Sequence, residues 1–257
     1  MTERTFVSQT PGPIVLGLSL QMGRVHVKVS QDLTTARVVL HTEDSTGPAA
    51  DAVNRARSEQ NGQALGIEVP EMPGNVMVTS VRGNRVTQTM GTVYGSVTGM
   101  TIINGRVVTG GSGGMQTVSQ IEATVHVPAG SSFALSTTSA DTVVWGDIDR
   151  MEIRSVSGDL DACDVRDLTV NSTSGDVRVN RVTERVTAQS VSGDIEVALY
   201  GGSHAQLAAT SGDIRVQATA VASGHLSARS ISGDVRVSGA RHLSVSADSV
   251  SGRVRNG

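Results

Sequence analysis

Apolar and polar residues alternate with a period of two through the second half of the chain. Clear examples are Val177-Arg178-Val179, Ile195-Glu196-Val197 and Ile214-Arg215-Val216. Alternation of this kind, with β-branched residues at the apolar positions, is typical of a strand that is buried on one face only. A second apolar stretch, such as Leu168-Thr169-Val170, precedes each turn. The pattern therefore predicts a long succession of short, half-buried strands.

A repeated Ser-Gly-Asp tripeptide separates these strands. Its glycines and aspartates are Gly158 and Asp159, Gly175 and Asp176, Gly193 and Asp194, Gly212 and Asp213, and Gly233 and Asp234. One such unit of 17–21 residues cannot bury its apolar face alone, but a stack of units can. The repeat predicts an all-β fold, a β-solenoid of about seven coils.

The first part of the chain has a different pattern, and we expect three regions. Residues 1–75 are predicted to form a small β-rich N-terminal cap with one short helix, residues 76–117 a Gly/Val/Thr-rich segment and loop, and residues 118–257 the solenoid repeats. Within the cap, residues 14–20 and 25–29 alternate around a predicted hairpin. Residues 48–59 are predicted to be helical, with Ser45 and Thr46 as candidate caps and Pro48 in the first turn.

The repeated turns have a structural and a functional interpretation. Glycine can supply a positive φ at the corner, and the Ser and Asp side chains can satisfy free backbone groups of the turn. A column of carboxylates could instead share calcium ions. Calcium-binding nonapeptide repeats carry far more Gly and Asp per turn than this chain does. We therefore interpret the Asp column as a turn device and predict no metal site.

A second column of charged residues lies two positions after each aspartate. It consists of Asp161, Arg178, Glu196, Arg215, Arg236 and Arg255. The first four alternate in sign, which predicts ion pairs between neighbouring coils. The candidate interaction residues are Arg215, Arg236, Arg253 and Arg255. They could bind an acidic or phosphorylated partner, or they could form a solvated basic tip that deters unwanted strand pairing. Both interpretations stay open.

The Ser-Gly-Asp ladder, followed each time by apolar-charged-apolar triplets, resembles the bacterial "putative adhesin" β-strand-repeat family. The resemblance extends from about residue 12 onward and includes the stretch 125–130, Val-His-Val-Pro-Ala-Gly. It implies a β-solenoid and no known catalytic residues. Within the Gly/Val segment, residues 84–88 and 92–97 resemble short amyloid-type signalling motifs, which template cross-β stacking. An ordinary hairpin is the alternative for that segment.

Composition narrows the classes of function. Hydrophobic residues make up 38% of the chain, charged residues 18%, and the net charge is −3, which argues against a partner bound by bulk charge, such as nucleic acid or a membrane surface. The single cysteine, Cys163, excludes an intramolecular disulfide and makes a zinc cluster implausible. The N-terminus has no basic-then-apolar run of a signal peptide, so a cytoplasmic location is expected, with non-classical export left open.

No carboxylate pair, nucleophile–base pair or phosphate loop stands out, so we predict that the protein is not an enzyme. The expected function is that of a structural or interaction protein presenting a binding or self-assembly surface. Its partner would be a protein or a second copy, without cofactor, metal, obligatory small molecule, nucleic acid or membrane insertion. One alternative is a signalling adaptor that uses residues 84–109 as an amyloid-type motif. Another is a carbohydrate-active solenoid, for which Trp145, Tyr94 and Tyr200 are the candidate aromatics.

Overall fold

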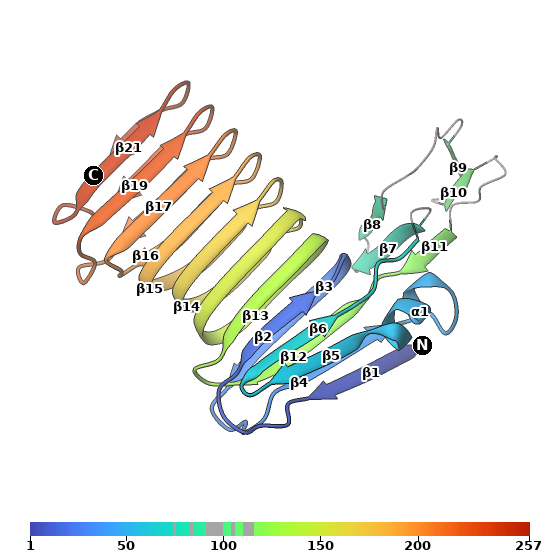
Figure 1. The fold of residues 1–257 in the computed structure, drawn as a ribbon. Helices are drawn as coiled ribbons and strands as arrows, with labels where there is room; N and C mark the ends of the chain where they lie inside the picture. The colour runs from blue at the N-terminus through green and yellow to red at the C-terminus, as the bar shows by residue number, and fades with distance from the viewer. Residues whose placement is uncertain (74–75, 83–84, 91–99, 104–105, 110–115) are drawn as a thin grey trace.

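The computed structural model describes residues 1–73, 76–82, 85–90, 100–103, 106–109 and 116–257. Within these residues, one sheet of 17 strands coils into a flattened β-solenoid of about six turns. Figure 1 shows its strands stacked as rungs from the N-terminal half to the C-terminus. The predicted β-solenoid is confirmed, with a coil count close to the expected seven.

The repeats supply the strands of the C-terminal half. Three long strands bend around one edge of the solenoid: β13 (Ser132–Ser157), β14 (Leu160–Ser172) and β15 (Val177–Ser190). In later coils the same path is divided into shorter strands: β16 (Ile195–Tyr200), β17 (His204–Ala209), β18 (Ile214–Ala218), β19 (His225–Ser230), β20 (Val235–Ser238), β21 (Ser244–Ser249) and β22 (Val254–Asn256). All of these strands pair in parallel with the neighbouring coils.

Each coil contributes one strand to each of two faces. Face A contains the strands that follow the Ser-Gly-Asp turns, namely residues 142–145, 160–163 and 177–180 with β16, β18, β20 and β22. Face B contains the strands that precede the next turn, namely residues 150–155, 167–172 and 185–190 with β17, β19 and β21. The apolar partners of the alternating pattern stack between the faces, as Ile195 and Ile214 do.

The N-terminal strands extend both faces. They are β1 (Thr2–Val7), β2 (Val15–Ser19), β3 (Met22–Ser30), β4 (Arg37–Thr42), β5 (Arg57–Asn61), β6 (Ala64–Glu68) and β12 (Glu122–Pro128). On face A, β3 pairs with β12 and with residues 139–145, and β4 lies between β12 and β1. On face B, β2 pairs with β6 and with residues 132–136, and β5 is the edge strand.

The predicted hairpin between residues 14–20 and 25–29 is wrong, because β2 and β3 pair with different neighbours on opposite faces. Leu18 and Leu20 on one side of the corner and Met22 and Val25 on the other are all buried. Burial of both apolar stretches in the same core therefore makes this segment turn a corner, as a solenoid coil does.

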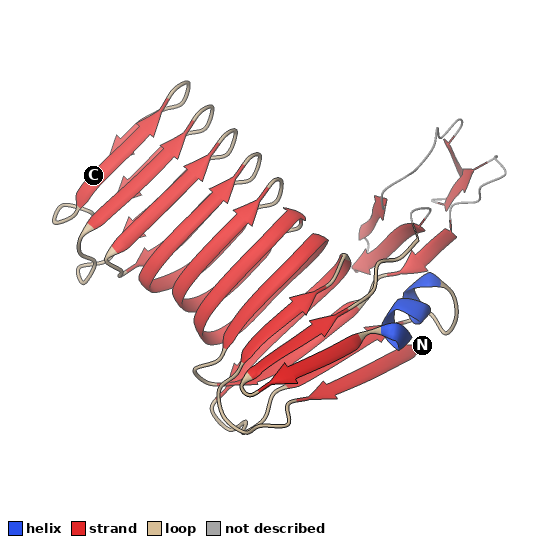
Figure 2. Ribbon diagram, viewed as in Figure 1, coloured by secondary structure: helices blue, strands red, loops and turns tan. Residues whose placement is uncertain are grey.

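The described helix, α1 (Pro48–Arg55), packs against β1 and β4 and is drawn in blue in Figure 2. Pro48 lies in its first turn, as expected, but Gly47 occupies the N-cap without a side-chain cap, so the expected Ser45 or Thr46 cap is wrong. The helix also ends before residue 59, because residues 57–61 form β5 and pair with β6. Strand pairing at the edge of the sheet thus replaces the last helical turn expected.

Two small sheets lie in the segment between the cap and the repeats. Their strands are β7 (Val76–Arg82), β8 (Arg85–Met90), β9 (Met100–Ile103), β10 (Arg106–Thr109) and β11 (Gln116–Ser119). β7 pairs with β8 and β11, and β9 pairs with β10. Much of the stretch 84–109, namely residues 84, 91–99 and 104–105, lies outside the described residues. The amyloid-type motif stays a prediction.

Candidate binding surfaces

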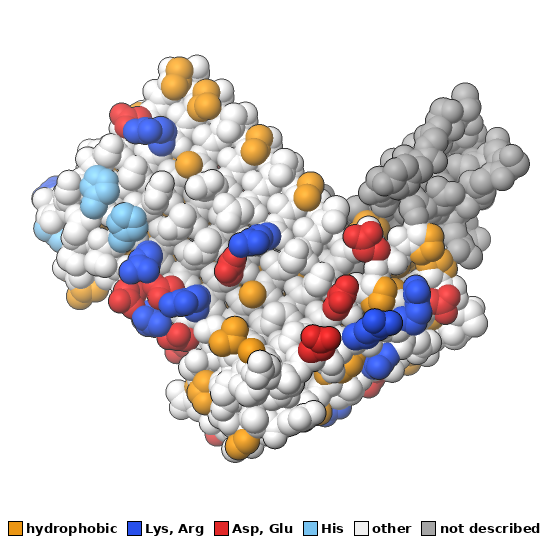
Figure 3. Space-filling model, viewed as in Figure 1, with side chains coloured by type: hydrophobic (Ala, Val, Ile, Leu, Met, Phe, Trp, Pro, Cys, Tyr) orange, Lys and Arg blue, Asp and Glu red, His pale blue; other side chains and the backbone are white. Residues whose placement is uncertain are grey.

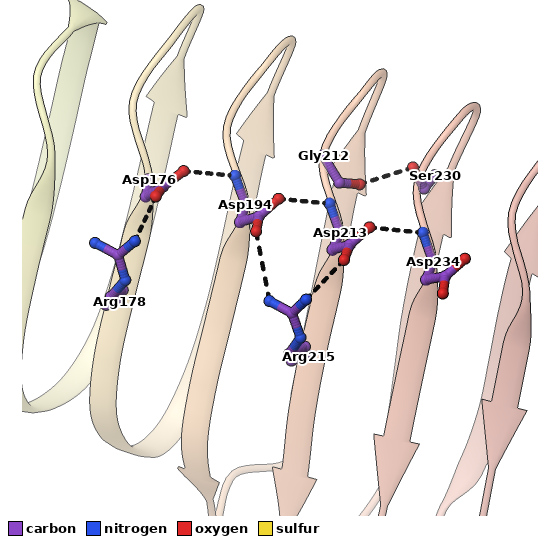
Figure 4. A network of polar contacts seen from close by, with 8 residues as sticks. All are labelled: Asp176, Arg178, Asp194, Gly212, Asp213, Arg215, Ser230 and Asp234. Atoms are coloured by element: carbon purple, nitrogen blue, oxygen red, sulfur yellow. Dashed lines mark hydrogen bonds and ion pairs between the residues drawn. The ribbon is translucent and has the colours of Figure 1, made fainter.

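The repeat aspartates form a hydrogen-bonded ladder along the turn edge of the solenoid (Figure 4). An Oδ1 atom of each aspartate accepts the backbone N–H of the equivalent residue in the next coil. The distances are 2.9 Å from Asp176 to Asp159, 3.0 Å from Asp194 to Asp176, and 2.8 Å from Asp213 to Asp194 and from Asp234 to Asp213. Each carboxylate therefore satisfies a backbone donor of the following coil and fixes the register between coils.

The repeat glycines are required mainly by close stacking. Positive φ occurs at Gly158 (118°) and Gly175 (124°), but the prediction that it explains all five glycines is wrong at Gly193, Gly212 and Gly233. At these three positions a Cβ atom would lie 1.9–2.0 Å from the carbonyl oxygen of the preceding repeat glycine. No side chain fits at that separation, so the turns stack backbone against backbone.

A serine three residues before the repeat glycine also supports the turn. The hydroxyls of Ser190, Ser230 and Ser249 accept the N–H of Gly193, Gly233 and Gly252 at 2.8–2.9 Å. Ser230 and Ser249 also donate to the carbonyl of the preceding repeat glycine. These serines, and not the serine of the tripeptide, are the ones that bond to the repeat glycines in the described residues. The recurrence of Ser-x-x-Gly in the sequence is the signal that could have revealed them.

The arginine column has the predicted register but different ion pairs. Arg178, Glu196 and Arg215 lie opposite one another in successive coils. The arginines nevertheless turn toward the aspartate ladder: Arg178 pairs with Asp176, and Arg215 pairs with Asp213 at 2.6 Å and Asp194 at 3.4 Å. The expectation of pairs between column members is wrong here, because the turn carboxylates offer the guanidinium groups two oxygens close by.

Of the four arginines predicted to interact with a partner, Arg215 is therefore engaged within the turn edge. Arg236 and Arg255 follow it in the same column at the C-terminal coils. Arg253 donates its backbone N–H to Asp234 and replaces the last aspartate of the ladder. In the part of the chain that the structure describes, the side chains of Arg236, Arg253 and Arg255 take part in no ion pair.

At the opposite edge of the solenoid, a second ladder of charges joins three coils. Arg166 contacts Asp149 at 2.6 Å and 3.0 Å and also pairs with Glu184. The hydrogen bond from Arg166 lowers the pKa of the Asp149 carboxyl and raises the pKa of the guanidinium. At Asp164, burial would raise the pKa, but hydrogen bonds from Arg181 and Asn180 outweigh it and lower the pKa. This ladder joins the coils on the solvent side of the corner, where Ile148, Val165 and Val182 are buried beneath it.

The lowered pKa values predict a loss of stability in acid. A carboxyl whose pKa falls on folding stabilises the protein above its ordinary pKa of 3.8, and that contribution disappears as the pH falls through the lower folded value. We expect the temperature of the thermal unfolding midpoint, measured at low ionic strength, to decrease when the pH is lowered below about 4. Arg166→Met should lower the midpoint at neutral pH and reduce its change on acidification. Arg185→Met, at an exposed arginine without an ion pair among the described residues, should behave as the wild type.

An apolar ridge runs along the turn edge. It consists of the residues just before each tripeptide, Val156, Thr173, Val191, Thr210, Ile231 and Val250, and we call it the turn ridge. The side chains of Val156, Val191, Ile231 and Val250 are 52%, 47%, 49% and 79% exposed. Figure 3 shows hydrophobic groups spaced along this edge. Repetition of the turn thus places apolar side chains in a row in solvent.

A groove of about 870 Å³ lies beside the turn ridge on face B. Its floor is made of small and uncharged polar side chains such as Asn171, Gln189 and Ala208, and Arg154 and Arg229 also line it. A hollow of about 540 Å³ adjoins it at residues 136 and 154. There, Gly17 pairs with Gly66 and Ala134 across three strands, which leaves the sheet surface bare. Face B therefore offers a shallow trough with little net charge.

The described residues contain no group of three or more His, Cys, Asp and Glu side chains that could hold a metal ion. His204 and His225 lie opposite each other in adjacent coils, and Arg185 and Ser244 occupy the flanking coils. No helix in the described ranges is long and apolar enough to cross a bilayer. The notable features are thus extended surfaces and not a compact polar centre.

Stacked parallel coils of 17–21 residues with a repeated turn define the protein as a β-solenoid repeat protein. Residues 48–256 match the Toastrack DUF4097 family, and the chain belongs to that family. The predicted membership of a bacterial "putative adhesin" family is confirmed. Among curated proteins, a search by similarity finds no match.

Several solved structures are similar to the chain along its whole length. A "putative adhesin" from Bacteroides fragilis is 14% identical, with 99% of this chain and 97% of that chain covered and a TM-score of 0.49. A "putative cell adhesion protein" from Clostridium sporogenes is 9% identical, with 92% and 98% covered and a TM-score of 0.39. A "putative lipid binding protein" from Parabacteroides distasonis is 11% identical, with 100% and 97% covered and a TM-score of 0.39.

Proposed function

We propose that the protein is a non-catalytic scaffold that self-associates by packing its turn ridge against the turn ridge of a second copy. The observation that carries this proposal is the row of exposed Val156, Val191 and Ile231 beside the groove of face B, whose floor is mostly small and uncharged polar side chains. A contiguous row of exposed apolar side chains marks an interaction site more often than scattered ones do.

The pattern of the ridge suits a second copy of the same chain. From Val156 to Thr210, apolar side chains alternate with Thr173 and Thr210, so a large residue recurs every second coil, roughly 10 Å apart at the spacing of paired strands. Two such stretches, related by a two-fold axis and offset by one coil, would place Val156 and Val191 against the threonines of the other copy. The net charge of −3 opposes this association only weakly.

Light scattering behind a sizing column, over a concentration series, tests the proposal. Burying a half-exposed Val or Ile contributes roughly 1 kcal/mol, and a two-fold interface counts each side chain twice. The triple variant Val156→Ser, Val191→Ser, Ile231→Ser should therefore weaken association by at least about 100-fold. The matched control replaces Val7, Val15 and Val221, which are 53%, 53% and 78% exposed away from the ridge, with serine.

Other outcomes of the same experiment separate the alternatives. A wild type that stays monomeric at every concentration contradicts the proposal. Assembly that survives the ridge variant but is lost on deletion of residues 84–114 favours the signalling adaptor with its amyloid-type motif. Assembly that changes with Arg253→Glu and Arg255→Glu, but not with the ridge variant, places the contact at the C-terminal coils and returns Arg236, Arg253 and Arg255 to the role predicted for them.

A further inference from the structure

The one tryptophan of the chain lies on face A, away from the turn ridge. Trp145 is 45% exposed, whereas Tyr200 is completely buried. The indole is stacked on the His26 ring, with 5.4 Å between the ring centroids and 9° between the planes. The stack fixes the orientation of the indole and keeps much of its apolar surface in contact with water. A rigid, exposed aromatic ring of this kind is a usual component of a binding site.

A groove of about 350 Å³ begins at Trp145 and crosses four coils of face A. Small side chains, Val143, Cys163 and Ala198, line it and leave room above the sheet. The groove is open along one side, so it can admit a segment of an extended ligand as well as a small molecule.

Three charged side chains stand in one row of this groove. Asp161, Arg178 and Glu196 are direct neighbours in adjacent strands, so the two acidic residues are roughly 10 Å apart with Arg178 on the strand between them. Arg178 also pairs with Asp176, whereas Asp161 and Glu196 form no ion pair or side-chain hydrogen bond with any described residue. Their oxygens are therefore free to accept hydrogen bonds from a ligand.

This combination selects a ligand by charge. The carboxylates of Asp161 and Glu196 oppose an anion, while Arg178 in the groove and Lys28, which lies beside Trp145 in the next strand, oppose a cation. The alternation of acceptor, donor and acceptor instead matches hydroxyl groups, each of which can donate to a carboxylate and accept from a guanidinium. An apolar platform beside such groups matches the C–H face of a sugar ring.

We propose that this groove binds a neutral saccharide of several sugar units, with one pyranose ring packed on the exposed part of Trp145 and with hydroxyls of successive units bonded to Asp161, Arg178 and Glu196. The site is separate from the turn ridge and does not depend on self-association. Binding requires no covalent bond to be made or broken.

Because Trp145 is the single tryptophan in the sequence, its fluorescence reports on this site alone. The full chain is titrated to millimolar concentration with four tetrasaccharides: β-1,4-linked glucose, β-1,4-linked N-acetylglucosamine, α-1,4-linked glucose and β-1,4-linked xylose. We expect a saturable change of emission with at least one of them. No change with any of the four overturns the proposal, and so does an equal response to tetramethylammonium or to free phosphate.

Variants locate the binding, measured by calorimetry with the saccharide that responds. Trp145→Ala should weaken it by about tenfold or more, and Trp145→Tyr, which keeps an aromatic platform, should recover much of the loss. Asp161→Asn and Glu196→Gln, which keep the shape of the side chains, should each weaken it several-fold. Val191→Ser on the turn ridge should leave it unchanged. Binding that is unaffected by Trp145→Ala while the variant remains folded by circular dichroism overturns the site.

Discussion

Replacing Gly212 with alanine is expected to lower the thermal unfolding midpoint by about 10 °C, or to prevent folding. The added Cβ would lie 2.0 Å from the carbonyl oxygen of Gly193 and 2.6 Å from its carbonyl carbon. Overpacking of a well-packed site costs roughly 1–3 kcal/mol and sometimes more. The cost at Gly212 should lie at the upper end of this range, because the obstructing atoms belong to the backbone and cannot move aside as a flexible side chain can. Each kcal/mol corresponds to roughly 2–4 °C for a chain of this size.

The matched control is Gly17→Ala in strand β2. A Cβ at Gly17 meets nothing within 4 Å, and its backbone φ is not in the left-handed region. This variant should keep the wild-type midpoint or raise it slightly, because alanine loses less backbone freedom on folding than glycine does. The midpoint of each variant can be followed by circular dichroism at 218 nm or so, the usual β-sheet signal. Equal midpoints for the two variants would contradict the stacking explanation.

The sequence predicted the fold because one local pattern is repeated many times. A single Ser-Gly-Asp turn is weak evidence, but its recurrence with period-two alternation identifies coils and places the aspartates in one column. The register of Glu196 with Arg178 and Arg215 follows directly from that spacing. The features that recur in every coil, namely the turns and the register between coils, could therefore be predicted from the sequence.

Features that depend on a single location were not predictable in the same way. The corner at residues 20–22 resembles a hairpin locally, and only the shared core shows that it joins two faces. The helix ends early because residues 57–61 pair with the next strand along the chain, β6, across a turn at Gly62, and this pairing outweighs the helical pattern. The choice of Arg215 between Glu196 and the turn carboxylates depends on side-chain geometry that the order of residues does not contain.

The candidate surfaces also contain features that the sequence pattern predicts and features that depend on distant contacts. The turn ridge was present in the sequence as a Val, Thr or Ile before every tripeptide, and its exposure follows from its place at the tip of the turn. The exposure of Trp145 follows the alternation, because Val144 beside it is buried and residues 139–145 keep one register with β3. Its stack on His26 was not predictable in this way, because it depends on the pairing of β13 with β3, which is far away in the sequence.

Ser230→Ala is expected to give the second largest loss of stability. The Ser230 hydroxyl is fully buried, donates to the Gly212 carbonyl at 2.9 Å and accepts from the Gly233 N–H at 2.9 Å. Alanine would leave these two backbone groups without their partner, at a cost of about 1–3 kcal/mol. The midpoint should fall by roughly 3–8 °C. Ser232→Ala, at an exposed hydroxyl of the same turn, is the control and should have almost no effect.

One coil already has alanine at this turn position, because Ala209 is equivalent to Ser190 and Ser230 in the neighbouring coils. Ala209→Ser should supply the Gly212 N–H with the acceptor that Gly193 and Gly233 already have. We expect this variant to raise the midpoint by a few degrees, since a buried hydrogen bond contributes about 1 kcal/mol. A lowered midpoint for Ala209→Ser, together with an unchanged one for Ser230→Ala, would show that the hydroxyls follow the turn geometry and do not stabilise it.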